Sequence, residues 1–460
     1  MDLNMTWGEL AQACGGTLAQ GRGTDPVRAI STDSRRIAPG QAFWALAGGR
    51  HDAHEFLDDA RARAADGWVV RRGAKLPARL PRHLVEAADT LRALGDLAAR
   101  HRKRFSIPIV GITGSNGKTT VKEMLRAVLA QRGPVCATSG NFNNEIGLPL
   151  SVLELAREHA FGVFEMGASR AGDIALLGRI AQPTIGVLTN IGSAHAEFFG
   201  GLEGTFRAKS ELVDSLPDGA PAILNLDDDW LPRLLPRLGE RAWTFGRSDK
   251  AKVRVLDAPA GELRLALAGS EISLKRPWAG HIHRLNAAAA AAAASALGLS
   301  AAEIQRGLEA YAPAAMRFEP KQHRSGAWLV LDAYNANPES MRAGILTFLE
   351  TAQGICREES APRLVLVLGD MKELGPESER MHRELGSWLA GRPLAAVLLA
   401  GEAVAETARA LAESGAPFPV EHRAAAEALL PLLRERLAPG TAVYFKASRA
   451  MKLEELAEKL

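Results

Sequence analysis

The sequence predicts an α/β protein with a small mixed N-terminal domain, a central domain built on a mainly parallel sheet, and a doubly wound C-terminal domain. Three observations support this fold class. The chain has 460 residues, which is too long for one ordinary hydrophobic core. From Ile107 onward, apolar segments of strand length alternate with helical patterns, as in sheets that have helices on both faces. A second alternating series starts near Pro313.

The N-terminal segment, to about residue 84, mixes short strands with turn residues, as in STDSRRIAPGQAFWALAGGRHDAHEF. The next stretch, LVEAADTLRALGDLAARHRKR, has apolar residues at three-to-four spacing and is expected to form a linking helix. Its basic end, Arg102-Lys103-Arg104, is expected to be solvated. We therefore expect domains at residues 1–84, 85–312 (with the linking helix) and 313–460.

The two later domains are indicated by their strand patterns. The central domain contains the apolar run from Ile107 to Val110, then FGVFEMG, TIGVLTNIG and PAILNLDDD. The run from Ala287 to Ala294 favours a helix that packs closely, with a structural role. The last domain contains WLVLDAY, RLVLVLGD, LAAVLLAGE and TAVYFKAS, each followed by a helical pattern. No G-x-G-x-x-G motif opens this series, so a nicotinamide cofactor is not expected.

The composition is that of a soluble globular protein, with 47% hydrophobic and 24% charged residues. The net charge of +3 and the lack of basic blocks interleaved with aromatic residues predict no nucleic-acid partner. No apolar stretch reaches the roughly 18 residues of a membrane span, so no membrane insertion is expected. Cys14, Cys136 and Cys356 lie far apart, as expected for reduced thiols in the cytoplasm.

The segment GITGSNGKTT, Gly111 to Thr120, follows an apolar strand and opens a helical pattern. It is expected to bind nucleotide phosphates, because glycines let backbone N–H groups converge at a helix N-terminus. Lys118 is expected to reach the outer phosphates, and Thr119 or Thr120 to ligate Mg²⁺. The strict P-loop formula requires glycine where this chain has Ile112. A glycine-rich turn with an incidental lysine is the alternative interpretation.

Polar residues follow the other central strands. Glu165 ends FGVFEMG and His195 follows TIGVLTNIG, at the strand ends where ligands of open α/β sheets bind. They are candidate ligands for a second Mg²⁺, or else a salt-bridged glutamate and a surface histidine. The segment ATSGNFNNEIGLP carries three asparagines suited to polar substrates or to a turn.

Of three further charged residues, only two have a functional interpretation from the sequence alone. Lys209 alone is an ordinary helix lysine. Arg317 and Asp332 flank the entry to the third domain, where arginine suits phosphate and a carboxylate suits ribose hydroxyls. The alternative is a structural ion pair between these two residues across the domain junction.

Together these motifs resemble the Mur ligase superfamily, whose members join an amino acid or peptide to a UDP-muramoyl precursor. TGSNGKTT is similar to the family's variant P-loop. The fourteen-residue interval from His195 to Lys209 resembles that between its metal-binding histidine and carbamylated lysine. The fifteen residues from Arg317 to Asp332 resemble the spacing of its arginine and ribose-binding aspartate. DAYNANPESM and LGDMKELGPESERMH resemble the branch that adds D-alanyl-D-alanine to UDP-N-acetylmuramoyl-tripeptide.

The resemblance runs from TDSRRIAPGQAFWAL to KASRAMKLEELAEKL and so covers all three expected domains. It implies a UDP-substrate domain, a P-loop ATPase domain and a Rossmann-like domain. The implied reaction is ATP-dependent amide formation through an acyl phosphate, in the synthesis of peptidoglycan for cell-wall biogenesis, cell shape and division. The implied partners are these small-molecule substrates, with the chain a cytoplasmic monomer.

The resemblance also implies roles for individual residues. The ATP site would comprise Gly114, Ser115, Asn116, Gly117, Lys118, Thr119, Thr120, Asn286, Arg317 and Asp332. Mg²⁺ would be held by Thr119, Glu165, His195 and a carbamylated Lys209, and the catalytic residues would be Lys118, His195 and Lys209. The substrates would meet Ser31, Asp33, Ser34, Arg35, Asn141, Asn143, Asn144, Tyr334, Asn335, Asn337, Lys446 and Arg449.

Two segments depart from the family pattern. The usual G-x-H-N-x-x-N reads GHIHRLN here, so Ile282 replaces the histidine, and His281 or His283 is the candidate substitute. The usual D-G-H reads Asp52-Ala53-His54, which lacks a glycine turn. Three alternatives stay open: a ligase of the superfamily that adds a single amino acid or glutamate, a degenerate ligase, and a nucleotide-dependent switch.

Overall fold

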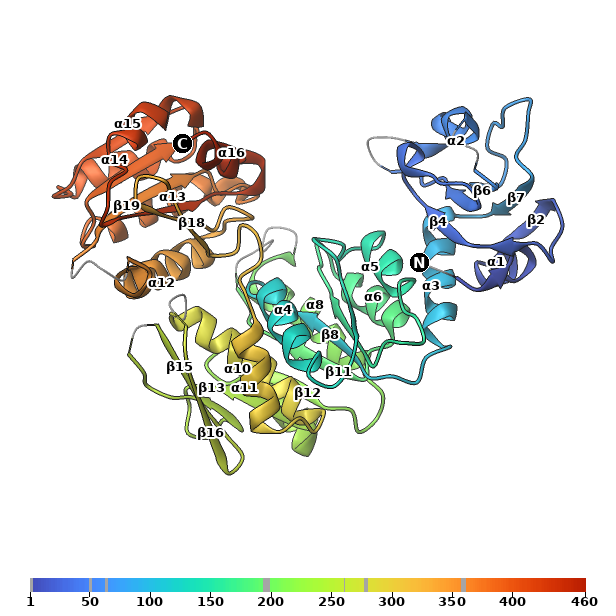
Figure 1. Cartoon of the computed structure of the whole chain (residues 1–460), viewed down its shortest axis with the longest axis horizontal. Coiled ribbons are helices and arrows are strands. Elements are labelled where there is room, and N and C mark those ends of the chain that lie inside the picture. The colour runs from blue at the N-terminus through green and yellow to red at the C-terminus, as the bar shows by residue number, and fades with distance from the viewer. Residues whose placement is uncertain are drawn as a thin grey trace.

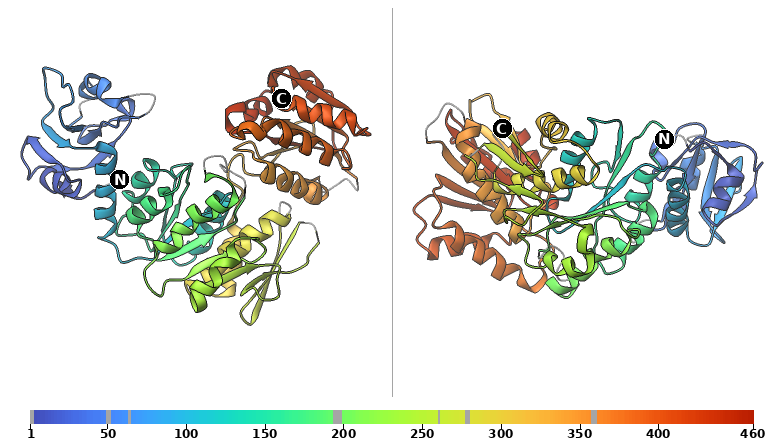
Figure 2. Two further views of the ribbon diagram at one scale, coloured as in Figure 1. Left: turned by 180° about the vertical axis from the view of Figure 1, so that it is seen from behind. Right: turned by 90° about the horizontal axis from the view of Figure 1, so that it is seen from below.

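The computed structural model describes residues 3–48, 52–62, 65–192, 199–259, 261–276, 280–356 and 361–460. These residues form sheets of five, nine and six strands and one two-stranded ribbon. The N-terminal and C-terminal units lie at opposite ends of the central unit (Figure 1). Viewed from below, the three units follow one another along the long axis (Figure 2). The predicted α/β class and three-domain architecture are confirmed.

The N-terminal sheet has the order β2-β7-β6-β5-β4 and is parallel except for β2. Its strands are β2 (Thr17–Gln20), β4 (Ala29–Ser31), β5 (Gln41–Trp44), β6 (Gly67–Arg71) and β7 (His83–Ala87), beside the ribbon of β1 (Met5–Thr6) and β3 (Pro26–Val27). The helices of this unit are α1 (Trp7–Ala13) and α2 (Leu57–Ala62).

The linking helix predicted from Leu84 is wrong at its start. Strand β7 runs across the proposed boundary at residue 84, and helix α3 is confined to Thr90–Arg102. The Asp89 carboxylate accepts hydrogen bonds from the N–H groups of Leu91 and Arg92, which fixes where the helix begins. The predicted solvated end is also wrong for Arg102, which is 6% exposed because its guanidinium donates to the carbonyls of Ala181 and Phe105.

The central sheet has the order β16-β15-β14-β13-β12-β11-β8-β10-β9 and is parallel from β9 to β14. The predicted segments form β8 (Ile109–Thr113), β10 (Phe161–Glu165), β11 (Ile185–Leu188) and β12 (Ala222–Asn225). The added strands are β9 (Val135–Ala137), β13 (Ala242–Gly246), β14 (Val253–Val255), β15 (Glu262–Leu267) and β16 (Ser270–Lys275). The helices are α4 (Lys118–Leu129), α5 (Gly147–Val152), α6 (Asp173–Ala181), α8 (Leu202–Asp214), α9 (Leu235–Leu238), α10 (His281–Ala296) and α11 (Ala301–Ala310).

The C-terminal sheet has the order β17-β18-β22-β19-β20-β21, with β17 antiparallel. The four predicted segments are β18 (Trp328–Leu331), β19 (Arg363–Gly369), β20 (Ala396–Ala400) and β22 (Thr441–Lys446), and the added strands are β17 (Glu319–Gln322) and β21 (Val420–Arg423). The helices are α12 (Pro338–Cys356), α13 (Ser378–Leu389), α14 (Ala405–Glu413), α15 (Leu430–Arg434) and α16 (Leu453–Glu458).

The alanine run lies within α10 and is fully buried from Ala287 to Ala294, as the close-packing prediction requires. Helix α10 contacts α4 on one side and α12 on another, so one apolar cluster extends from the central unit into the C-terminal unit. Helix α12 lies between α10 and the C-terminal sheet (Figure 1). Among the helices of the described part of the chain, none has the length and apolar character that a membrane crossing requires.

Candidate active site

A cavity of about 870 Å³ lies where the strand ends of the central and C-terminal sheets face each other. Such a position, outside the carboxyl ends of parallel strands, is where open α/β sheets bind ligands. The lining includes all ten residues predicted for the ATP site: Gly114, Ser115, Asn116, Gly117, Lys118, Thr119, Thr120, Asn286, Arg317 and Asp332. It also includes nine further predicted residues: Glu165, Lys209, Asn141, Asn143, Asn144, Tyr334, Asn335, Asn337 and Lys446.

We call the turn within the segment Gly111 to Thr120 the glycine loop. It owes its shape to Gly114 and Gly117, which have φ values of +145° and +83°. A Cβ at Gly114 would lie 1.9 Å from the hydroxyl oxygen of Thr189, and one at Gly117 would lie 2.5 Å from Asn286 Oδ1. Ile112, where the strict P-loop pattern has glycine, is a fully buried residue of β8. The turn therefore starts two residues later than in the strict pattern, which explains the unusual spacing.

Lys118 is the first residue of α4, and its ammonium donates to the carbonyl oxygens of Gly114 at 2.8 Å and Ser115 at 3.3 Å. Burial lowers the pKa of Lys118, the Arg317 guanidinium lowers it further, and the Glu165 carboxylate opposes both. The lysine thus brings its positive charge into the loop at the N-terminus of a helix, a position suited to anions.

Glu165 ends β10 and is 2% exposed. Its Oε2 accepts a hydrogen bond from the Thr119 hydroxyl at 2.8 Å, and its Oε1 accepts one from Asn143 Nδ2 at 2.7 Å. No ion pair of Glu165 occurs within the described ranges, so the salt-bridge alternative receives no support there. Asn144, by contrast, accepts from the N–H groups of Ile146 and Gly147 and acts as a turn residue.

Lys209, on α8, is 2% exposed, so the alternative of a solvated helix lysine is wrong. Burial lowers the pKa of Lys209 to about 7, and the Lys118 ammonium acts in the same direction. Its ammonium lies 5.8 Å from the centre of the Phe199 ring. His195, its predicted companion, lies outside the described residues. Within the part of the chain that the structure describes, no three His, Cys, Asp or Glu residues form a metal-binding group.

The C-terminal unit contributes two cationic side chains to the cavity. Arg317 donates to the Thr119 hydroxyl at 3.2 Å and lies over the Tyr334 ring at 3.9 Å. Asp332 pairs with Lys446 at 2.7 Å and accepts from the Tyr444 hydroxyl at 2.6 Å. The alternative of an ion pair between Arg317 and Asp332 is therefore wrong, because each has a different partner.

The altered segment at the start of α10 also reaches the cavity. Ile282, His283 and Asn286 line it, and His281 is absent from the lining. His283 packs edge-on against Phe318, and burial lowers its pKa to about 4 although Asp332 acts to raise it. Of the two candidate histidines, His283 is therefore the one that meets the cavity, with an apolar Ile282 beside it.

The predicted N-terminal residues lie at the end of β4 and in the turn that follows it, and none of them lines the cavity. The Ser31 hydroxyl donates to the carbonyl of Asp33, and the Asp33 carboxylate accepts from the backbone and guanidinium of Arg35. Ser34 begins the short helix that Asp33 caps. Ala53 lies in a similar turn capped by Asp52, so the missing glycine of that motif needs no positive φ.

One residue predicted from the C-terminal unit lies outside the cavity lining, and one residue that supports the glycine loop was not predicted. Arg449 pairs with Glu454 and is absent from the cavity lining. The sequence prediction missed Asn190, whose side chain bonds to both the N–H and the carbonyl of Asn116 and so supports the glycine loop. The signal was the TN pair at the end of the TIGVLTNIG strand.

Comparison with known proteins agrees with the resemblance. The Mur ligase middle domain matches residues 112–294, and the Mur ligase glutamate ligase domain matches residues 316–449. A curated UDP-N-acetylmuramoyl-tripeptide–D-alanyl-D-alanine ligase from Bacillus subtilis is 33% identical over 98% of this chain and 97% of its own length.

Two solved structures extend the comparison. A crystal structure of MurF from Acinetobacter baumannii matches with a TM-score of 0.87 and 31% identity, covering 99% of this chain and 98% of that one. MurF ligase from Thermotoga maritima in complex with ADP matches with a TM-score of 0.81 and 30% identity, covering 94% and 96% of the two chains. The chain therefore belongs to the Mur ligase family, within its MurF branch.

Proposed function

We propose that this chain is an ATP-dependent ligase that joins D-alanyl-D-alanine to UDP-N-acetylmuramoyl-tripeptide, in the synthesis of peptidoglycan precursors. One observation carries the proposal: the glycine loop, Glu165 and Lys209 of the central unit share a single cavity with Arg317 and Asp332 of the C-terminal unit. The full-length similarity to ligases of this activity supports the same substrates.

ATP occupies the cavity with its phosphates on the glycine loop, where backbone N–H groups and the start of α4 favour anions. Lys118 and Arg317 neutralise charge on the transferred phosphoryl group. Asp332 and Asn286 contact the nucleoside. The terminal carboxylate of the tripeptide attacks the γ-phosphorus, the bond to the ADP oxygen breaks, and an acyl phosphate forms. The amine of the dipeptide then attacks the acyl carbon, loses a proton and displaces phosphate.

Thr119 and Glu165 fit a Mg²⁺ ion, because the hydroxyl and the carboxylate lie 2.8 Å apart and oxygen donors are what this ion prefers. Bound there, the ion supplies positive charge to the phosphates. Asn143 holds the second oxygen of Glu165 and so orients the carboxylate. The proposal assigns a second ion to His195 and a carbamylated Lys209.

Carbamylation of Lys209 is supported by the chemistry of its amine. A neutral amine adds to the carbon of CO₂ through its lone pair, one C–O π bond breaks, and a proton leaves, which gives an anionic carbamate. The pKa of about 7 means that the unmodified amine is largely neutral above that pH and protonated below it. The carbamate is therefore expected to form on the alkaline side and to be lost on the acid side.

With isotopically labelled bicarbonate, NMR is expected to show a carbamate carbon at about pH 8 that disappears as the pH falls below about 7. Lys209→Gln should remove the signal. Lys209→Ala should lose activity and regain part of it when a short-chain carboxylic acid is added. A spectrum of the parent protein without this carbon across the whole pH range would refute the modification.

The N-terminal loop with Ser31, Asp33, Ser34 and Arg35 is assigned to the UDP end of the precursor. Asn141, Tyr334, Asn335 and Lys446 are assigned to the peptide substrates, and Arg449 to the carboxylate of the dipeptide. The proposal also includes a monomeric chain in the cytoplasm. Cys14, Cys136 and Cys356 are all buried, and no disulfide joins them in the described part of the chain, which fits a reducing compartment.

The deciding assay measures phosphate released from ATP and Mg²⁺ with the UDP-tripeptide, in the presence and absence of D-alanyl-D-alanine. We expect release to require both substrates and to be accompanied by a product with the mass of precursor plus dipeptide less water. Equal or faster turnover with a single amino acid in place of the dipeptide would favour the alternative ligase of the superfamily, which adds a single amino acid or glutamate. Nucleotide binding without any product would favour the switch.

A further inference from the structure

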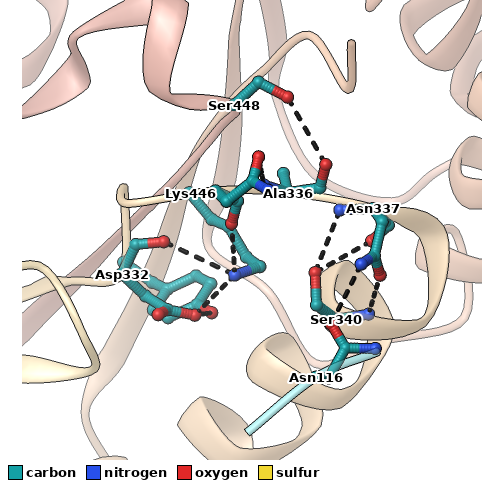
Figure 3. Close-up of polar contacts among 9 residues, drawn as sticks. Asn116, Asp332, Ala336, Asn337, Ser340, Lys446 and Ser448 are labelled. Carbon is teal, nitrogen blue, oxygen red and sulfur yellow. Dashed lines mark hydrogen bonds and ion pairs between the residues drawn. The ribbon is translucent and has the colours of Figure 1, made fainter. Parts of the chain in front are cut away.

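One side chain of the C-terminal unit connects directly to the glycine loop. Asn337 Nδ2 donates a hydrogen bond to Asn116 Oδ1 at 2.9 Å, between residues 221 positions apart in the chain (Figure 3). Asn337 is 9% exposed, so water competes little for this amide. We name this contact the amide bridge.

The C-terminal end of the amide bridge is held rigidly. Asn337 precedes α12, and its Oδ1 accepts from the Ser340 N–H at 2.8 Å while its own N–H donates to Ser340 Oγ at 3.0 Å. This reciprocal pair resembles a capping box, and Pro338 occupies the first helical position, where proline fits well. One side chain therefore caps α12 with its oxygen and contacts the glycine loop with its nitrogen.

The backbone just before Asn337 is held by hydrogen bonds from the last residue of β22 and from a serine that follows this strand. The Lys446 ammonium donates to the carbonyl of Asn335 at 3.1 Å, and the Ser448 hydroxyl donates to that of Ala336 at 3.4 Å (Figure 3). Lys446 also forms the ion pair with Asp332. The segment from Asp332 to Asn337 is therefore attached both to the C-terminal sheet and to the glycine loop.

The other end of the bridge is fixed to the central sheet. The Asn116 carbonyl accepts from Thr189 Oγ1 at 2.6 Å and from Asn190 Nδ2 at 3.0 Å, and its N–H donates to Asn190 Oδ1 at 2.9 Å. Asn116 directly precedes Gly117, whose left-handed backbone starts α4. A displacement of the Asn116 side chain would therefore shift the backbone N–H groups at the start of α4, which the proposed function assigns to the phosphates of ATP.

We infer that Asn337 is a positioning residue that aligns the phosphate-binding loop with the C-terminal unit, through its amide contact with Asn116. This inference rests on the ATP site of the proposed function and adds a specific determinant of nucleotide affinity. It concerns nucleotide binding alone and does not depend on which peptides the enzyme joins.

The variant Asn337→Ser separates the two tasks of the side chain. A serine hydroxyl still accepts from the Ser340 N–H, and serine is as good a cap as asparagine. The hydroxyl is too short to reach Asn116. We expect about a tenfold loss of affinity for Mg²⁺ with a non-hydrolysable ATP analogue, measured by calorimetry without peptide substrates. KM for ATP should rise by a similar factor, with kcat reduced less.

Asn116→Ala removes the bridge from the other end and should cause a similar loss. If the amide bridge is responsible, the double variant should bind the ATP analogue no more weakly than either single variant, because both substitutions remove the same contact. Binding of UDP-N-acetylmuramate, which carries the UDP end assigned to the N-terminal unit and lacks the peptide, should stay unchanged in all three variants.

Glu350→Ala is the matched control, because Glu350 lies on the same helix and joins the same two units. Its Oε2 accepts from the His281 N–H at 2.8 Å, away from the glycine loop. This variant is expected to keep nucleotide affinity within about twofold of the parent. The inference is overturned if Asn337→Ser binds the analogue as tightly as the parent, if Glu350→Ala weakens it equally, or if the two asparagine substitutions are additive.

Discussion

Lys118→Met is expected to lower kcat by on the order of a thousandfold while the protein stays folded. The ammonium is the cation of the glycine loop, held 2.8 Å from the Gly114 carbonyl oxygen at the start of α4. Methionine fills a similar volume but offers no charge to a phosphoryl group that carries several negative oxygens. The measurement is phosphate release under saturating substrates, with circular dichroism to confirm the fold.

Lys122→Met provides the comparison for Lys118→Met. Lys122 lies one turn further along α4, is 1% exposed and pairs with Glu123, and it is absent from the cavity lining. Its loss is expected to lower the melting temperature and to leave kcat within about threefold of the parent. A kcat for Lys118→Met within tenfold of the parent would contradict the assigned role.

Asp332→Ala is expected to lower the free energy of unfolding of the C-terminal unit by about 3 kcal/mol and to abolish activity. The Lys446 side chain is only 4% exposed, and Asp332 Oδ2 is its carboxylate partner at 2.7 Å. Without the carboxylate, a buried ammonium is left with backbone carbonyls, and Tyr444 loses its acceptor. Urea unfolding followed by fluorescence measures the loss.

The double variant Asp332→Ala with Lys446→Met distinguishes charge from packing. Removing both members of a buried pair costs much less than removing one, so most of the lost stability should return while activity stays absent. Two results would show that this ion pair does not stabilise the C-terminal unit. One is a double variant as unstable as Asp332→Ala, and the other is a free energy of unfolding for Asp332→Ala within about 1 kcal/mol of the parent.

Local patterns were sufficient to predict most of the fold. The eight strands predicted in the central and C-terminal units are short apolar runs with helical patterns after them, which is a signal contained in neighbouring residues. The start of α3 was mistaken because Leu84 and Ala87 continue the helical spacing by coincidence, while the strand they form depends on pairing with β6. The capping Asp89 was the local signal that separates strand from helix.

The residues that line the cavity were predicted better than the contacts between them. The family motif placed Lys209 in the site, but the burial that lowers its pKa depends on side chains distant in sequence. The ion pair of Asp332 with Lys446 was not predicted, and the alternative pairing with Arg317 is wrong, because β18 and β22 are adjacent only in the folded sheet. The contact between Asn116 and Asn337 likewise exists only once two units meet.

The most direct test of the mechanism follows oxygen atoms. If the tripeptide carboxylate attacks the γ-phosphorus, a precursor whose terminal carboxylate carries a heavy isotope at both oxygens must transfer one labelled oxygen to each released phosphate. Mass spectrometry of the phosphate after complete ligation is predicted to show that single label. Unlabelled phosphate, formed together with the correct peptide product, would contradict an acyl phosphate and with it the central account of this active site.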